Sequence, residues 1–117
     1  MLVVLGLGAA GCASTPVPNE KIAVAKASVE RAEQAGAVEY APVEMQAARD
    51  KLSRAVRANS DHDRVPAADL ADQANADARL AEATAQEHKS HKAATELDAS
   101  LQNLRQESNR TTTQPAQ

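Results

Sequence analysis

The apolar positions that follow residue 18 recur every third or fourth residue, which places them along one face of a helix. They are Ile22, Ala25, Val29, Ala32 and Gly36. Asn19 is a favourable cap for the amino-terminal end, and Glu20 then lies in the first turn, where negative charge is stabilised. Gly36 suits the left-handed conformation that often follows a last helical turn. The pattern predicts a helix over residues 19–35.

A second helical pattern begins at Pro42, a residue suited to the first position of a helix. Its apolar face is formed by Met45, Ala48, Leu52, Ala55 and Val56. Arg54 and Arg57 lie near its carboxyl-terminal end, where positive charge is favourable. We predict a helix over residues 42–58. Residues 36–41 form the connector, in which we expect Tyr40 to pack at the corner between the two helices.

The polar residues 59–63 are typical of a turn, and a third helix is expected to begin between Asp63 and Pro66. Because neither Pro nor Gly then occurs before Pro115, the helix can continue to about Glu107, a length of roughly 60 Å. One row of this helix alternates steps of four and three residues and consists only of alanine: Ala67, Ala71, Ala74, Ala78, Ala81 and Ala85. We call this row the alanine seam.

A second row on the same helix is longer and more mixed. It contains Leu80, Ala83, Ala94, Leu97, Leu101 and Leu104. The alanine seam predicts close contact with the two shorter helices or with another copy of the third helix; the alternative is an exposed helix that is merely rich in alanine. The leucines near the end of the third helix lie beyond the reach of the shorter helices. This projecting segment is expected to form a surface for a partner or a second copy; the alternative is that it folds back or frays.

These patterns predict an all-α fold in which two short helices pack on a long, alanine-rich third helix, as a helical bundle, hairpin or coiled-coil-like structure. The residues expected at the helix contacts are Ile22, Val29, Met45, Leu52, Ala71, Ala74, Ala78 and Ala81. Composition agrees, because 27 of the 117 residues are alanine, Tyr40 is the single aromatic residue, and β-branched residues are scarce. The core must therefore be thin.

The first residues of the chain resemble a bacterial lipoprotein signal. An apolar run from Met1 to Gly8 is too short to cross a bilayer and ends in Ala9, Ala10, Gly11 and Cys12. Small residues before a cysteine form a lipobox, at which lipoprotein signal peptidase cleaves. Cys12 would then carry diacylglycerol and acyl chains, which anchor the protein stably to a membrane. The alternative is an ordinary secreted protein cleaved near Ala13.

The signal differs from the usual lipobox in two ways. Ala9 stands where Leu is more common, and no Lys or Arg precedes the apolar run. We therefore expect the true translation start to lie upstream. Ala13 and Ser14 follow the cysteine, and the lack of an Asp there favours the outer membrane, on its periplasmic face. The expected organisation is a signal peptide at 1–11, a lipidated cysteine and tether at 12–18, a helical domain at 19–107 and a disordered tail at 108–117.

Candidate chemistry is sparse. His88 and His91 lie three residues apart with Glu87 beside them, but two imidazoles without a further ligand hold a metal weakly. Asp61 and Asp63 flank His62 in the turn, where capping explains them better than a bound cation. No catalytic triad or carboxylate pair is readable. We expect no enzyme activity, no metal and no cofactor beyond the lipid on Cys12. Thirteen basic residues are mixed with sixteen acidic ones, which predicts no nucleic-acid binding.

Four segments of the chain resemble a known family. They read NEKIAVA at 19–25, RAEQAGA at 31–37, EYAPVE at 39–44 and ADLADQANADARLAE at 68–82. The sequence from about Asn19 to Glu107 resembles the bacterial lipoproteins of the domain of unknown function 4398 family. Members typically have a Gly-Asp-Tyr turn before the last helix, where this chain has Ser60, Asp61 and His62. The resemblance implies a helical envelope lipoprotein, often found near or joined to outer-membrane proteins with peptidoglycan-binding domains, and it supplies no catalytic residues.

These observations favour a structural or adaptor lipoprotein that presents a helical rod to an envelope or peptidoglycan-associated protein. The alternative is a self-assembling alanine-zipper lipoprotein, and a third is a module that binds a small ligand or a metal. Murein lipoproteins often end in a Lys that is joined to peptidoglycan. This chain ends in Pro115, Ala116 and Gln117, so we expect no such attachment.

Overall fold

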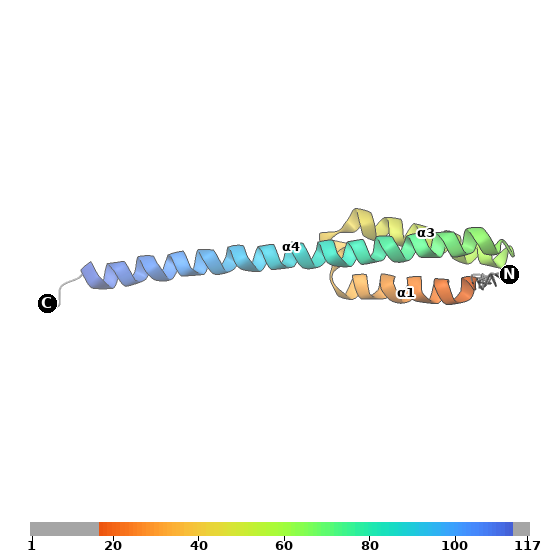
Figure 1. Cartoon of the computed structure of the whole chain (residues 1–117). Coiled ribbons are helices and arrows are strands. Elements are labelled where there is room, and N and C mark those ends of the chain that lie inside the picture. The colour runs from red at the N-terminus through yellow and green to blue at the C-terminus, as the bar shows by residue number, and fades with distance from the viewer. Residues whose placement is uncertain (1–16, 114–117) are drawn as a thin grey trace, which may run out of the picture.

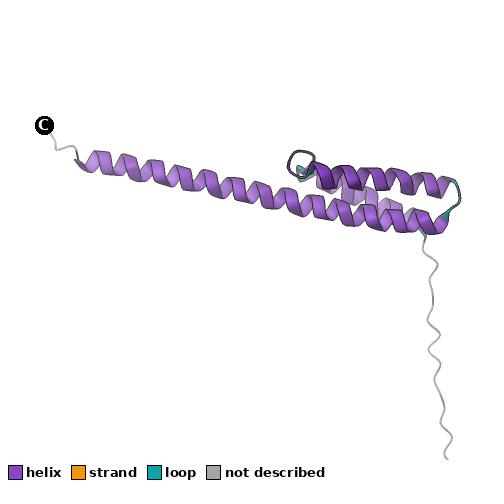
Figure 2. Cartoon of the chain, turned by 90° about the horizontal axis from the view of Figure 1, so that it is seen from above, coloured by secondary structure: helices purple, strands orange, loops and turns teal. Residues whose placement is uncertain are grey.

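The computed structural model of the chain describes residues 17–113. It contains four helices within that range and no strand: α1 (Pro18–Gln34), α2 (Ala37–Tyr40), α3 (Pro42–Ser60) and α4 (Arg64–Thr113). Figure 1 shows α1 and α3 packed along the first half of α4, while the second half of α4 continues alone. Figure 2 shows the same arrangement from above. The predicted all-α fold, with two short helices on a long third one, is confirmed.

The first helix starts one residue earlier than predicted. Val17 is the residue before α1, and Pro18 occupies the first turn, where its missing N–H costs nothing. The proposed Asn19 cap is therefore wrong. The Asn19 side chain instead joins two helices, because Asn59 of α3 donates a hydrogen bond from Nδ2 to Asn19 Oδ1 at 2.8 Å.

The corner between α1 and α3 is more ordered than a simple connector. Gly36 has a φ of +88°, the left-handed conformation expected of it, and the short helix α2 follows directly. The Gly36 carbonyl oxygen accepts hydrogen bonds from the N–H groups of Glu39 and Tyr40. A side chain at position 36 would contact the Tyr40 ring at 3.4 Å. Half-buried Tyr40 packs against the core at this corner, and Pro42 begins α3.

The turn from α3 to α4 is a Schellman motif. The N–H of Asp63 donates to the carbonyl oxygen of Ala58 at 2.9 Å, and the N–H of His62 donates to that of Asn59 at 3.2 Å. His62 occupies the left-handed position with a φ of +66°, where glycine is the usual residue. This turn reverses the chain, so that α4 runs back along α3.

The last helix is longer than predicted, because it continues past Glu107 to Thr113. Residues 108–113, which we assigned to a disordered tail, are helical. The Oγ1 atoms of Thr111, Thr112 and Thr113 each donate to the carbonyl oxygen four residues earlier, at 2.7–3.0 Å. These bonds satisfy the hydroxyl groups without breaking the helix. Residues 114–117 of the predicted tail lie outside the described residues.

Candidate interaction surface

The alanine seam lies inside the molecule. All six of its residues have an exposed fraction of 0%, and they face α1 and α3 of the same chain. Alanine lets the three helices approach closely, but each buried methyl group contributes only on the order of 0.8 kcal/mol. The seam is therefore the internal contact of a three-helix bundle with a thin core.

Most of the buried core residues form two clusters. The larger one surrounds Met45, the largest fully buried side chain among residues 17–113, and includes Val29, Ala78 and Ala81. The smaller one includes Ala71 and Ala74, with partly buried Ile22 at its edge. Leu52 is partly buried and packs against both clusters, so it connects them. Val56, which we placed on the apolar face of the second helix, is about half exposed.

Polar contacts supplement the thin core. Ser28 of α1 is buried and donates from Oγ to Oδ1 of Asn75 on α4 at 2.6 Å, and Arg31 Nη2 donates to the same Ser28 oxygen at 2.8 Å. Lys51 of α3 pairs with Asp77 of α4 at 2.6 Å. These contacts fix the relative position of α4 against both shorter helices.

Further ion pairs lie at the edges of the bundle. Lys21 of α1 pairs with Asp72 of α4, and Arg49 of α3 pairs with Glu33 of α1 at 2.6 Å. Both pairs are partly exposed, so each contributes at most about 1 kcal/mol. They connect α1 with both α4 and α3.

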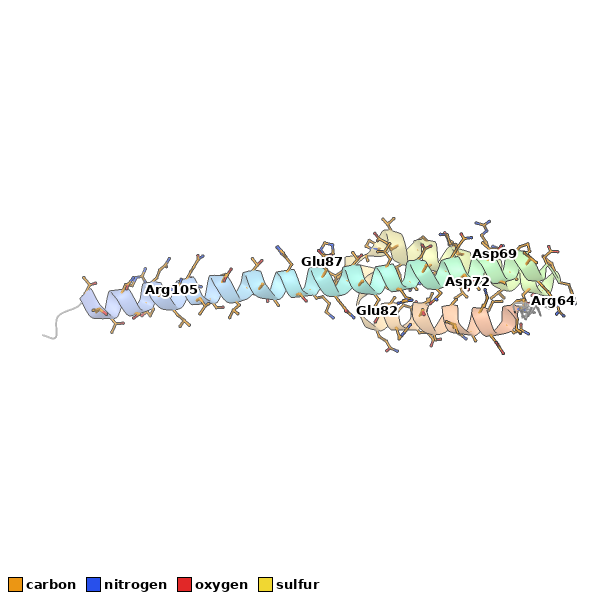
Figure 3. The ribbon with its side chains drawn as sticks, viewed as in Figure 1. Arg64, Asp69, Asp72, Glu82, Glu87 and Arg105 are labelled. Carbon is orange, nitrogen blue, oxygen red and sulfur yellow. The ribbon has the colours of Figure 1, made fainter. Side chains whose placement is uncertain are left out.

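The bundle ends near Lys89. Its Nζ donates to the carbonyl oxygen of Ala35, at the carboxyl-terminal end of α1, at 3.3 Å. Ala85 is the last buried residue of α4, and every described residue from 86 onward is exposed. Figure 3 shows the side chains of this half of α4, Arg105 among them, projecting without another helix beside them. We call residues 90–113 the arm; they span roughly 35 Å.

The second row of apolar residues is exposed along the arm. Leu97, Leu101 and Leu104 have exposed fractions of 60%, 41% and 66%, and Leu80 in the bundle half is also more than half exposed. At 100° per residue, this row lies about 140° around α4 from the alanine seam. It therefore faces away from α1 and α3, and we call Ala94, Leu97, Leu101 and Leu104 the leucine stripe.

The histidines predicted as weak metal candidates lie where the arm begins. Glu87, His88 and His91 line a shallow, open hollow on the surface. Residues 17–113 contain no group of three or more His, Cys, Asp or Glu side chains that could hold a metal ion. The lipobox residues Ala9, Ala10 and Gly11 and the lipidation residue Cys12 lie outside the described residues.

The polar contacts between the helices have only weak signals in the sequence. A serine at the 25, 28, 32 spacing of α1 is a polar residue on an apolar face, which is a sign of a buried hydrogen bond. Its partner Asn75 lies 47 residues away, and no spacing rule connects the two. The Asn19–Asn59 contact between helix ends is equally long-range, and sequence reasoning missed both.

Fold and surface define a small all-α protein: a three-helix bundle with one helix extended as an arm. The chain belongs to the family described as Domain of unknown function (DUF4398), whose family model matches residues 20–97. This match confirms the resemblance inferred from the sequence. No curated protein matches the chain, and no solved structure does. The matched residues include the bundle except Pro18 and Asn19 at the start of α1, and Leu101 and Leu104 of the leucine stripe lie beyond them.

Proposed function

We propose that this protein is a lipid-anchored structural or adaptor module of the bacterial envelope, without catalytic activity. The observation that carries the proposal is the run Ala9, Ala10, Gly11 and Cys12 after an apolar segment, only six residues before α1 begins at Pro18. A diacylglycerol on Cys12 with further acyl chains would give a stable anchor. None of the helices in residues 17–113 has the length and apolarity to cross a membrane.

The position of α1 indicates which end of the protein a lipid on Cys12 would hold next to the membrane. Pro18 lies at the end of the bundle where α3 turns into α4, and Thr113 lies at the far tip of the arm (Figure 1). The six residues 13–18 can span at most about 20 Å. A lipid on Cys12 would therefore hold the bundle close to the membrane. Because Ala13 and Ser14 follow the cysteine, we place it on the periplasmic face of the outer membrane.

The arm supports the adaptor role. A long helix with every described residue after Ala85 exposed offers contact area that the bundle does not use. An envelope protein, such as one associated with peptidoglycan, is the partner class we propose. Self-assembly through the alanine seam has less support, because the bundle already covers all six alanines. A ligand or metal module has no comparable observation in its favour.

Crosslinking in intact cells tests the adaptor role. A photoactivatable amino acid at Asn103, on the arm, is compared with one at Val24, on the exposed face of α1. We expect the arm position to give a defined adduct with an envelope protein, and the α1 position to give none. Two results would contradict an adaptor role for the arm. One is the same set of adducts from both positions, and the other is crosslinking of Asn103 only to a second copy of this chain or to no protein.

A further inference from the structure

The leucine stripe is an apolar surface that no part of the described chain can cover. Ala94, Leu97, Leu101 and Leu104 are spaced by three, four and three residues, which is the repeat of a coiled-coil contact. The three leucines are between 41% and 66% exposed. Because the stripe faces away from α1 and α3, none of the helices in residues 17–113 packs on it.

Two opposite charges flank the stripe on the same side. Asp98 follows Leu97 and Arg105 follows Leu104, and their separation of seven residues is about two helical turns. When two copies of the helix lie antiparallel with Leu101 of each level with Leu104 of the other, the flanking positions meet. Asp98 of each copy then lies beside Arg105 of the other, which gives two ion pairs related by a two-fold axis.

A parallel pair does not use these charges. In a parallel pair, Asp98 of one copy would lie beside Ala93 of the other, and Arg105 would lie beside Ser100. The charge pattern is therefore complementary to a second copy only when that copy runs in the opposite direction.

The length of the arm fits this antiparallel register. The two-fold axis of the pair passes midway between Leu101 and Leu104. Thr113 of one copy therefore lies level with Lys92 of the other, just beyond the end of the bundle near Lys89. A register shifted by seven residues brings Asp98 beside Asp98 of the other copy.

We propose that the arms of two copies pair antiparallel through the leucine stripe, with Asp98 of each copy beside Arg105 of the other. The overlap of about 33 Å is short and contains few leucines, so the pair is weak and reversible. The first residues of the two α1 helices lie at opposite ends of the pair, roughly 120 Å apart. The pairing rests on the arm alone and is independent of the proposed lipid anchor.

Charge exchange tests this register by sedimentation equilibrium. The full chain carries Cys12→Ser, which removes its single thiol, and is kept in mild detergent. Asp98→Arg and Arg105→Asp should each weaken dimer formation by about tenfold, because each places like charges together. The double variant restores opposite charges and should return to within about threefold of the parent. Glu96→Arg, on another face of the arm, is the control and should change little.

Thiol crosslinking gives the direction of the two helices. A chain with Cys12→Ser and Asp98→Cys is mixed with one that carries Cys12→Ser and Arg105→Cys, and a short bismaleimide is added. We expect a crosslinked pair from the mixture and almost none from either chain alone. Three results would overturn the proposal. The first is a parent chain that stays monomeric at millimolar concentration, and the second is a double charge variant that dimerises as weakly as the single variants. The third is efficient crosslinking of Leu101→Cys chains to themselves when no Asp98→Cys to Arg105→Cys product forms.

Discussion

Ser28 of α1 and Asn75 of α4 form a hydrogen bond of 2.6 Å at the wall of a core built mainly from alanine. Ser28 is the one buried polar side chain among the core residues of 17–113, and Arg31 donates to the same oxygen. A core of methyl groups discriminates poorly between helix registers, since neighbouring alanines are alike. The Ser28–Asn75 bond selects one register of α1 against α4.

Ser28→Ala should lower the free energy of unfolding by about 1 kcal/mol, which is the usual net value of one hydrogen bond. The loss is limited because Asn75 is partly exposed and Arg31 is exposed, so both can bond to water instead. Ser53→Ala, at an exposed position of α3, is the matched control and should change stability by less than about 0.5 kcal/mol. Urea unfolding followed by circular dichroism measures both; equal effects would show that the Ser28 bond adds nothing.

Ala78→Leu should destabilise the bundle by about 1–3 kcal/mol, because the larger side chain has no space between α4 and its neighbours. Ala76→Leu makes the same change on the exposed face of α4 and should alter the free energy of unfolding by less than about 0.5 kcal/mol. Thermal melts and analytical ultracentrifugation distinguish the two variants. If Ala78→Leu leaves melting, helicity and mass unchanged, α4 is not packed on that side.

His62→Gly should stabilise the protein by up to about 1 kcal/mol. His62 holds the left-handed position of the Schellman motif, which costs a residue with a Cβ atom more than it costs glycine. Gly36→Ala is the converse change at the other left-handed position and should destabilise by about 1–2 kcal/mol. Differential scanning calorimetry of the two variants should therefore show melting temperatures that move in opposite directions; a shift in the same direction contradicts these turn conformations.

Ending the chain after Lys92 should leave the bundle intact, since every buried residue of the described chain precedes position 86. At low protein concentration, where pairing of arms adds little, the melting temperature should stay within about 3 °C of the parent. The helical signal per chain should fall by roughly a quarter, because α4 supplies residues 93–113 to the helical total. A large drop in melting temperature would mean that the arm folds back on the bundle.

The helices could be predicted because their signals are local. The spacing of Ile22, Ala25 and Val29, the proline at 42 and the glycine at 36 act within one or two turns, and the structure has helices and a turn at those places. The alanine seam also shows its period directly in the sequence. The end of α4 was misjudged because serine and threonine are typical of tails, whereas here their hydroxyl groups bond back to the helix.

The contacts that fix the arrangement could not be predicted. Ser28 and Asn75, or Asn19 and Asn59, meet only after the chain has turned at Gly36 and His62, and each pair is separated by 40 or more residues. The exposed leucine stripe was visible as a row in the sequence. The sequence did not show whether this row faces α1 and α3 or points away from them. The seam and the stripe lie on the same helix and differ only in the face they occupy, so the structure was needed to tell which face is covered.

The central claim, a lipid anchor at Cys12, is tested most directly by labelling cells with a palmitate analogue. Cells express the chain behind a complete signal peptide, either as it stands or with Cys12→Ser, and the membranes are then fractionated. We expect the parent chain to be labelled and recovered with the outer membrane, and Cys12→Ser to be unlabelled and released. A Cys12→Ser chain that stays in the membrane fraction to the same extent, with no label on the parent, would contradict the claim.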